Sequence, residues 1–527
     1  MPQPLYPGSI AETPDIQQAR SWAFSAHLSR LARKQPGKLA LECGDQALSY
    51  GGFDRQVTQL ANALRAHGIG RGDRVATVCM NHLEHVITIF AAWRLGAVAV
   101  PMNFRLAPPE LSFLIRDSGS RALVIDAALD RLEGAARTAL TVHLSVGRSD
   151  SGARDFAAFL AGGSDVHEYV HVEQQELCAI MYTSGTTGLP KGAMLSCENL
   201  LAQAHNVMAL FRVSGDDEVN LCGVPLFHIA GIAGMLPNFR VGGHTVIQRL
   251  GAFDPLRTLE LIRDKKVTQA FLVPSQWQAV CALPPLQPPI TSLRRISWGA
   301  APTTVAILEA MAQRFPGVDN VAVFGQTEMS PVTCALEARD ALRKIGSVGK
   351  PIAGVEARIV DAAMNDVPRG EVGEIVYRGP TMMLGYWNRP DATREAFAGG
   401  WFHSGDLVRE DDEGFLYVVD RLKDMLISGG ENIYCAEVEA AIQSHPDVME
   451  AAVIGRAHDK WGEVPVVVVA PSAGRQLTEQ QILDHVRDRL ARYKQPAAVY
   501  FVDALPRNAS GKVTKQVLRE RYAKPPA

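Results

Sequence analysis

The most constraining feature of the sequence is an alternation that runs from about residue 40 to residue 330. Short runs rich in β-branched residues, such as "RVATVCM", are followed by segments with a helical period, such as "HLEHVITIFAAWRLG". A strand followed by a helix and then by another strand is the unit from which parallel sheets are built. The sequence therefore predicts an α/β fold with a large N-terminal domain of βαβ-built sheets.

The pattern changes after about residue 350. "EARIVD", "GEIVYRG" and "GFLYVVD" read as strands separated by short Gly, Pro and Asp turns, which favours a small antiparallel β-subdomain. Helices and strands then resume over a tail that is long enough for a separate small α+β domain. We predict an N-terminal domain over residues 1–419 that includes the β-subdomain at about 350–419, a joint at 420–424, and a C-terminal domain over 425–527.

Composition and charge favour small-molecule partners. The chain has 527 residues, of which 47% are hydrophobic, so it can bury a large core. Its formal net charge is −3, with Lys and Arg spread along the whole length. A protein that binds nucleic acid needs a concentrated basic face, and the sequence offers none.

The cysteines and the hydropathy bear on the compartment. The eight cysteines are scattered, with no CxxC pair and no His nearby at metal spacing, which indicates a reducing environment and argues against a zinc site. The first 20 residues lack the pattern of a signal peptide, and no stretch is apolar over the roughly 18 residues that a spanning helix needs. We therefore expect a cytoplasmic protein without a transmembrane segment.

The segment "MYTSGTTGLPKGAML", Met181 to Leu195, has the features of a phosphate-binding loop. An apolar strand runs into a loop with three glycines, four hydroxyl residues and Lys191. Backbone N–H groups in such a loop can converge on an anion, the hydroxyls add donors, and the lysine adds positive charge. The segment is not a Walker A motif, G-x-x-x-x-G-K-[ST], because Gly192 follows Lys191 where that motif has Ser or Thr. This departure argues against a kinase or ATPase of the P-loop type.

"YTSGTTGLPKG" closely resembles the signature of the adenylate-forming (ANL) superfamily, which includes acyl-CoA synthetases, aryl-CoA ligases, peptide-synthetase adenylation domains and luciferases. Further blocks follow in the order typical of that superfamily: "PLFHIAG", "SWGAAP", "FGQTE", "WFHSGDL", "DRLKD" and "PRNASGKVTK". The resemblance extends from about residue 20 to 520. It implies the ANL fold, with a mobile C-terminal domain, and the activity of a fatty-acyl-CoA synthetase.

The resemblance also implies which residues bind ATP. Those expected at the phosphates are Thr183, Ser184, Gly185, Thr186, Thr187, Gly188 and Lys191. Those expected at the adenine and ribose are Gly299, Ala300, Ala301, Phe324, Gly325, Asp406 and Arg421. Most members carry a tyrosine where this chain has Phe324, so stacking on the base is retained and one hydroxyl is lost.

Five residues receive roles close to the reacting groups by resemblance. Thr327 is expected to contact the AMP phosphate. Glu328 and Thr186 are expected to hold Mg²⁺, and oxygen ligands are those that this hard cation prefers. His228 is expected beside the acyl carboxylate. Lys512 resembles the catalytic lysine of the first half-reaction, where it would also contact ATP.

The implied reaction has two steps. A carboxylic acid and ATP give an acyl-adenylate and pyrophosphate, and coenzyme A then gives an acyl-CoA and AMP. A C-terminal domain hinged at Lys423 would present Lys512 for the first step and Gly429 and Gly430 for the second. Glycines would let the pantetheine arm of coenzyme A pass close to the backbone.

The residues expected to line the acyl pocket are mostly apolar, with no charged side chain to meet an α-amino group. That composition argues against a peptide-synthetase domain. The set is His228, Ile229, Ala230, Ile232, Ala233, Met235, Trp298, Met329 and Val332.

The wider sequence, including "NRPDAT" and "KWGEVP", looks most like medium- to long-chain fatty-acyl-CoA ligases. We therefore predict a fatty or alicyclic acid as the substrate. An aryl-CoA ligase for a cinnamate- or benzoate-type acid is the first alternative. A ligase that loads a carrier protein and a luciferase-like oxidase also stay open, as do a peripheral membrane contact and a homodimer.

Overall fold

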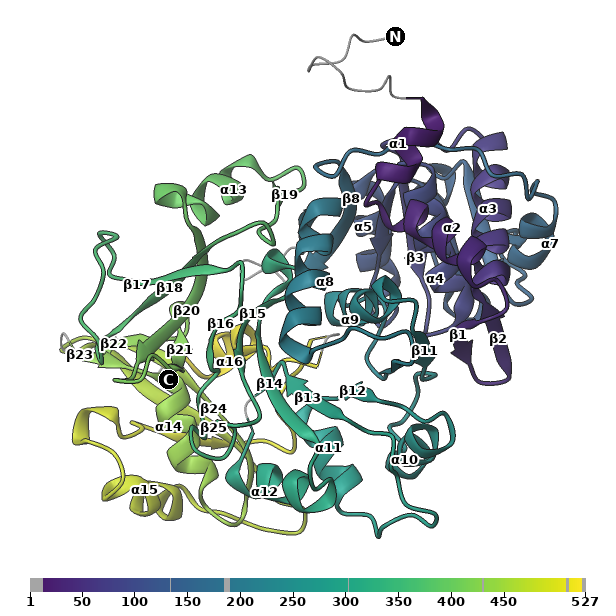
Figure 1. Ribbon diagram of the computed structural model, residues 1–527. Helices are drawn as coiled ribbons and strands as arrows, with labels where there is room; N and C mark the ends of the chain where they lie inside the picture. Colours follow the sequence, from purple (N-terminus) through teal and green to yellow (C-terminus); the bar gives the residue numbers. More distant parts are fainter. Residues whose placement is uncertain are drawn as a thin grey trace, which may run out of the picture. The chain divides into compact units, whose positions relative to one another are not determined.

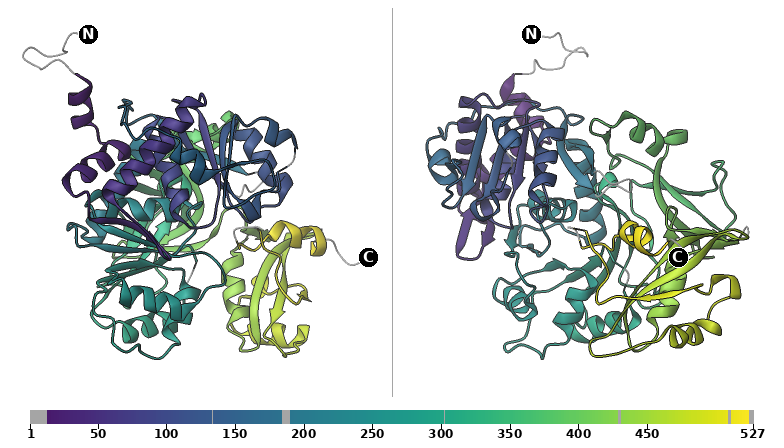
Figure 2. Two further views of the ribbon diagram at one scale, coloured as in Figure 1. Left: turned by 90° about the vertical axis from the view of Figure 1, so that its right-hand side faces the viewer. Right: turned by 180° about the vertical axis from the view of Figure 1, so that it is seen from behind.

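A computed structural model describes residues 13–132, 134–183, 190–301, 303–428, 431–508 and 511–523 (Figure 1). Contacts within the chain divide it into two compact units. The first unit is Met1–Glu356 with Arg378–Ala398, and the second is Ala357–Tyr377 with Gly399–Ala527. In Figures 1 and 2 the first unit runs from purple to teal with one green segment, and the second is green to yellow.

The first unit contains an eight-stranded sheet with the order β19-β9-β8-β4-β3-β5-β6-β7. Its middle strands are parallel, whereas β9 runs antiparallel to β8 and to β19. The strands are β3 (Arg74–Val78), β4 (Val98–Pro101), β5 (Ser120–Asp126), β6 (Val142–Val146), β7 (Arg154–Asp155), β8 (Leu177–Thr183), β9 (Lys191–Ser196) and β19 (Gly385–Tyr386).

A nine-stranded sheet has the order β16-β15-β14-β13-β12-β10-β11-β1-β2. The strands from β14 to β1 are parallel, and antiparallel strands complete both edges. They are β1 (Leu39–Cys43), β2 (Gln46–Ser49), β10 (Val219–Cys222), β11 (His244–Ile247), β12 (Gln269–Phe271), β13 (Arg295–Gly299), β14 (Asp319–Gly325), β15 (Val332–Leu336) and β16 (Lys350–Pro351).

Helices pack against both sheets of this unit (Figure 2). Helix α4 contacts β3 and β4 in one sheet and β1 in the other, and it is apolar and buried almost all round, as a helix between two sheets must be. The longer helices are α2 (Phe24–Lys34), α3 (Tyr50–Ala66), α4 (Leu83–Arg94), α5 (Pro108–Ser118), α8 (Cys197–Phe211), α9 (Ile229–Arg240), α10 (Pro255–Asp264), α11 (Pro274–Cys281) and α12 (Val305–Arg314). The short ones are α1 (Pro14–Arg20), η1 (Ala127–Leu129), α6 (Gly134–Thr138), α7 (Phe156–Ala161), η2 (Thr327–Met329) and α13 (Pro390–Ala396), with η3 (Ala398–Gly400) after them.

The second unit contains two sheets, of which the first confirms the expected β-subdomain. That sheet has the order β17-β18-β20-β21, and the other has the order β23-β22-β25-β24 with β26 paired to β25. The strands are β17 (Glu356–Val360), β18 (Val372–Arg378), β20 (Phe402–Glu410), β21 (Leu416–Arg421), β22 (Leu426–Ser428), β23 (Glu431–Ile433), β24 (Val448–His458), β25 (Gly462–Pro471) and β26 (Val499–Phe501). The helices are α14 (Cys435–Gln443), α15 (Glu479–Arg487), η4 (Arg492–Lys494) and α16 (Lys515–Tyr522).

The predicted joint at residues 420–424 lies inside the second unit. Strand β21 packs against α14, and the Asp420 carboxylate accepts a hydrogen bond of 3.3 Å from the backbone N–H of Ala436. Asp424 forms an ion pair of 2.8 Å with Arg519 on α16. These contacts join the β-subdomain to the C-terminal segment, so the boundary at 419 and the hinge stay predictions.

No helix in the described ranges combines the length and the apolar composition that crossing a membrane requires.

Candidate active site

Three of the predicted blocks begin at one edge of the nine-stranded sheet. Strands β10, β12, β13 and β14 are parallel neighbours, so their carboxyl ends meet at that edge. The segments that follow them there include residues 223–228 after β10, Ala300 and Ala301 after β13, and residues 326–329 after β14. Ligands of open α/β sheets bind at such carboxyl ends. The structure therefore brings the three blocks together where a ligand is expected.

Two glycines at this edge are required by backbone packing. A Cβ atom on Gly299 would lie 2.2 Å from the carbonyl oxygen of Val323 on the neighbouring strand. On Gly325 it would lie 1.9 Å from the carbonyl oxygen of Pro331. Both distances are far below any real Cβ contact, so only glycine fits. These positions thus have a structural reason for glycine besides the predicted contact with the nucleotide.

The other predicted adenine residues leave a surface at the same edge. Ala300 has a φ of 65°, which is rare for a residue with a Cβ atom, and both Ala300 and Ala301 are exposed. Phe324 is half-buried near the end of β14. Exposed backbone beside an aromatic ring is a suitable surface for a planar base.

Glu328 is the centre of a polar cluster. Its side chain is buried on η2, next to the half-buried Thr327. Its Oε1 accepts a hydrogen bond of 3.0 Å from the Tyr386 hydroxyl and lies 3.4 Å from the Thr183 hydroxyl, which can donate to it. The Lys191 ammonium lies 5.2 Å from the centre of the Tyr386 ring. The structure therefore joins the predicted phosphate loop to the predicted magnesium ligand.

Tyr386 was not predicted from the sequence. It lies on β19 and pairs with Ala193 on β9, which places it beside the base of the phosphate loop. Burial, together with the nearby Glu328 carboxylate, raises the pKa of Tyr386, so the phenol keeps its proton and donates it. The lone Gly-Tyr pair has no sequence signal of its own, because its role depends on a strand pairing across almost 200 residues of chain.

Part of the predicted site lies outside the described residues. This holds for Ser184, Gly185, Thr186, Thr187 and Gly188 in the phosphate loop, and for Gly429 and Gly430 on the predicted coenzyme A path. Thr183 and Lys191 close the base of the loop as paired residues of β8 and β9. The roles of the undescribed residues stay predictions.

His228 caps the N-terminus of α9. Its Nδ1 accepts a hydrogen bond of 3.2 Å from the backbone N–H of Ala230, so the ring is assigned as neutral, with its proton on Nε2. The side chain is exposed. A neutral imidazole with a proton on Nε2 can donate a hydrogen bond to a carboxylate.

Asn81 holds the segment that leads to His228, and no sequence pattern predicted this role. Its amide donates to the carbonyl oxygens of Val224 (2.8 Å) and Gln248 (3.2 Å), and its Oδ1 accepts from the N–H of Leu226 (2.8 Å). The side chain is only 2% exposed. One buried amide therefore satisfies three backbone groups beside the histidine-bearing loop.

The predicted acyl-pocket residues differ in accessibility. Ile229, Ile232, Ala233 and Met329 are fully buried, and Trp298 is buried with its indole N–H donating to Asn320 (3.0 Å). Ala230 and Val332 are half-buried. The open surface among these residues is therefore small.

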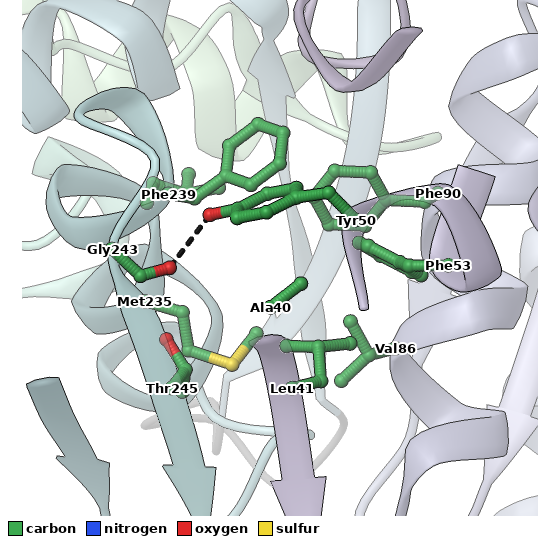
Figure 3. A pocket seen from close by; sticks show the side chains of 11 residues that line it. Ala40, Leu41, Tyr50, Phe53, Val86, Phe90, Met235, Phe239, Gly243 and Thr245 are labelled. Atoms are coloured by element: carbon green, nitrogen blue, oxygen red, sulfur yellow. Dashed lines mark hydrogen bonds between the residues drawn. The ribbon is translucent and has the colours of Figure 1, made fainter. Parts of the chain in front are cut away.

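Met235 faces a different space from the expected acyl pocket. It lines a narrow apolar cavity between β1, β11, α3, α4 and α9 (Figure 3). Aromatic rings of Tyr50, Phe53, Phe90 and Phe239 form much of the wall, and the Tyr50 hydroxyl donates to the carbonyl oxygen of Gly243 (2.6 Å).

The residues predicted at the ribose lie opposite each other in the second unit. Asp406 on β20 pairs with Arg421 on β21, and their side chains form an ion pair of 2.5 Å. Lys423 is exposed in the turn after β21. Lys512 is exposed in a turn whose backbone is fixed by Asn508, which accepts from the N–H of Lys512 (3.0 Å).

Models of known protein families match both the N-terminal and the C-terminal part of the chain. A family model described as AMP-binding enzyme matches residues 28–387, which is more than half of the chain. The chain belongs to this family. A second model, AMP-binding enzyme C-terminal domain, matches residues 437–512 of the same AMP-binding enzyme.

Individual relatives are similar in sequence to this AMP-binding enzyme over almost the whole chain. A feruloyl-CoA synthase from Amycolatopsis sp is 40% identical, covering 94% of this chain and 98% of the relative. A long-chain-fatty-acid–CoA ligase from Mycobacterium tuberculosis is 37% identical, covering 91% and 94%. The solved structure of o-succinylbenzoate CoA synthetase from Bacillus subtilis with its acyl-adenylate intermediate has a TM-score of 0.82 and 31% identity, covering 94% and 97%.

These matches confirm the ANL fold and the enzyme class that the sequence predicted. The chain is an adenylate-forming acyl-CoA synthetase of a family that uses ATP, Mg²⁺ and coenzyme A.

Proposed function

We propose that this AMP-binding enzyme converts a compact aromatic carboxylic acid to its coenzyme A thioester. The observation that carries this choice is the burial of Ile229, Ile232 and Met329 in the packed core. A long alkyl chain needs an extended apolar wall, and these side chains are already covered by protein. The 40% identity to a feruloyl-CoA synthase supports an aryl acid as well.

A fatty acid, the substrate predicted from the sequence, is the second candidate. It is supported by the 37% identity to a long-chain-fatty-acid–CoA ligase over nearly the whole length of both chains. All eight cysteines are free thiols, which supports the predicted cytoplasmic location for either substrate.

In the first step, we assign the attack on the α-phosphate of ATP to a carboxylate oxygen of the acid. An O–P bond forms, the bond to the β-phosphate breaks, and pyrophosphate leaves. His228 would donate from Nε2 to the carboxylate and orient it. Thr183 and Lys191, at the base of the loop, would bind the phosphates that depart.

Glu328 is the residue we assign to Mg²⁺. Its buried carboxylate has the hydroxyls of Thr183 and Tyr386 beside it, which gives the all-oxygen surroundings that Mg²⁺ prefers. Mg²⁺ bound there would neutralise charge on the phosphates. Tyr386 would fix the direction of the carboxylate, and Thr186 would add a second oxygen, as the resemblance implies.

The residues assigned to the first step are divided between the two units. Glu328, Thr183 and Lys191 belong to the first unit, whereas Asp406 and Lys512 belong to the second. The resemblance implies a cycle in which the C-terminal domain turns about Lys423, a residue that lies inside the second unit. One position would place Lys512 at the α-phosphate, and the other would place Gly429 and Gly430 beside coenzyme A, whose thiol displaces AMP from the acyl carbon.

A substrate panel tests the choice of acid. Release of AMP in the presence of coenzyme A would be measured with ferulate, cinnamate, benzoate, octanoate and palmitate. We expect the best aromatic acid to have a kcat/KM at least about 10-fold above that of either fatty acid. A fatty acid preferred by the same margin would reject the aryl proposal and leave the ligase class intact.

Replacing Asn81 tests whether it positions the acyl loop. In Asn81→Ala, three buried backbone groups lose their partner, at about 1–3 kcal/mol for each. We expect kcat/KM for the acid to fall about 10- to 100-fold because the loop with His228 shifts. The KM for ATP should change little, since the nucleotide residues lie on other segments.

Asn62→Ala is the matched control for Asn81→Ala. Asn62 also donates to two backbone carbonyls, those of Ser164 and Val166, but at an exposed site. It should leave the KM for both substrates unchanged. An equal rise of the two KM values in Asn81→Ala would show that Asn81 stabilises the fold without positioning the loop.

A further inference from the structure

A second cluster of metal-ligating side chains lies at the carboxyl edge of the eight-stranded sheet. Strands β3 and β5 are parallel neighbours there, with Val78 opposite Ile125. Cys79 and His82 follow β3, and Asp126 ends β5. One ligand atom from each of these three side chains lies within 4.8 Å of the other two. The reaction assigned above uses none of them.

The cluster is buried and internally ordered. Cys79 is 1% exposed and Asp126 is 6% exposed. The His82 Nε2 lies 2.6 Å from Asp126 Oδ1, and the backbone N–H of Met80 donates to Asp126 Oδ2 (2.9 Å). On the other side of the ring, Nδ1 lies 3.0 Å from Glu84 Oε2.

We propose that Cys79, His82 and Asp126 bind a transition-metal dication, of which Zn²⁺ is the best match. A thiolate, an imidazole nitrogen and a carboxylate oxygen are the three ligand types that Zn²⁺ takes in proteins. Three protein ligands leave a fourth tetrahedral position for water. The mixed sulfur and nitrogen set disfavours Mg²⁺, which prefers oxygen alone.

Glu84 supplies the outer contact that a metal-bound histidine usually has. A histidine that ligates a metal through one nitrogen almost always donates its other N–H to a carboxylate or carbonyl oxygen. If Nε2 faces the metal, the Glu84 carboxylate at 3.0 Å from Nδ1 would be the outer partner of the Nδ1–H group. The tautomer with its proton on Nδ1 is the one that metal binding through Nε2 needs.

Zn²⁺ would bind the Cys79 thiolate and the neutral His82 imidazole, so binding would release the protons that these two groups carry. The dication would then lie beside the Asp126 carboxylate that pairs with His82 in the metal-free protein.

The prediction of no zinc site rested on the absence of a CxxC pair and of a His at metal spacing. Its second ground was wrong, because the spacing Cys79-x-x-His82 suits two ligands of one metal. The third ligand is 44 positions beyond His82 and arrives only through the pairing of β3 with β5. Because the third ligand comes from a neighbouring strand of the sheet, no local motif in the sequence contains all three ligands.

Metal binding by the full-length protein tests the proposal. The metal-free enzyme in excess Mg²⁺ would be titrated with Zn²⁺ against a chromophoric chelator, and separately with Co²⁺ to follow thiolate-to-metal absorption. We expect one tight site and a thiolate–cobalt band. Cys79→Ser and Asp126→Asn should each weaken binding more than about 100-fold, and Glu84→Gln about 10- to 100-fold, the usual cost of an outer partner.

Cys281→Ser is the matched control, since Cys281 is half-buried and has no part in the cluster. It should bind Zn²⁺ as the unchanged protein does. Thermal unfolding of each metal-free variant would identify any that fail to fold. The cobalt band is measured on the unsubstituted protein, so it tests the proposal even if a variant does not fold. Absence of that band, or equal affinity in Cys79→Ser and Cys281→Ser, would overturn the proposal.

Discussion

Replacing Lys512 with alanine is expected to lower acid-dependent ATP–pyrophosphate exchange by about 100- to 1,000-fold, the usual loss when one charge-stabilising group at a reacting centre is removed. Thioester formation from supplied acyl-adenylate should be nearly unchanged, because Lys512 is assigned to the first step only. The fold should survive, since the side chain is exposed and the bonds to Asn508 are made by the backbone of residue 512.

Lys460→Ala is a suitable control for this experiment. Lys460 is another exposed lysine of the second unit, and it lies over the ring of Trp461 at 4.6 Å. Lys460→Ala removes one positive charge, as Lys512→Ala does, but at a position outside the assigned site. Both half-reactions should therefore be retained. If Lys512→Ala lost both half-reactions to the same extent, the division of labour between two positions of the C-terminal domain would be wrong.

Glu328→Gln is expected to have the next largest effect. The substitution keeps the shape of the side chain and removes the charge that we assign to Mg²⁺. We expect the rate of adenylate formation to fall about 100-fold or more. The Mg²⁺ concentration needed for half of the remaining rate should rise, because a neutral amide is a weaker ligand than a carboxylate.

Rates measured over a series of Mg²⁺ concentrations test this assignment. Glu337→Gln is the control, because Glu337 is a more exposed glutamate paired with Arg339 and stands nine positions from Glu328 in the chain. It should leave the Mg²⁺ dependence unchanged. A slower Glu328→Gln enzyme with the original Mg²⁺ dependence would assign Glu328 to packing around Tyr386 and not to the metal.

The parts of the fold that follow a local pattern were predictable. The alternation of strands and helices before residue 330 becomes two largely parallel sheets, and the strand-rich stretch after residue 350 becomes the β-subdomain. Blocks such as "SWGAAP" and "FGQTE" end strands that lie side by side, so their residues meet at the carboxyl edge. Parallel neighbouring strands end at the same edge of a sheet, so residues that directly follow such strands in the sequence can be expected to lie close together.

The parts that depend on distant pairing were not predictable. Tyr386 reaches Glu328 only because the two-residue strand β19 pairs with β9. Asn81 reaches Leu226 across 145 positions, and no local pattern marks such an amide. The contact between β21 and α14 lies across the predicted joint at residues 420–424, and no local pattern in the sequence marks it.

The sequence also did not predict correctly which apolar residues face the acyl pocket. An apolar residue near a predicted site can face the site or the core, and hydropathy does not distinguish the two. Met235 was expected beside the acid and instead lines the cavity against Tyr50 and Phe239 (Figure 3). Burial of Ile229 and Ile232, known only from the structure, changed the favoured acid from an alkyl to an aromatic one.

Isotopic labelling tests most directly whether a carboxylate oxygen of the acid attacks the α-phosphate of ATP. The acid would be labelled with ¹⁸O in its carboxylate and incubated with the enzyme, ATP, Mg²⁺ and coenzyme A. The ¹⁸O content of AMP and of pyrophosphate would then be measured by mass spectrometry. We expect each AMP to carry one ¹⁸O and pyrophosphate to carry none. Label in pyrophosphate or inorganic phosphate, with unlabelled AMP, would contradict this assignment.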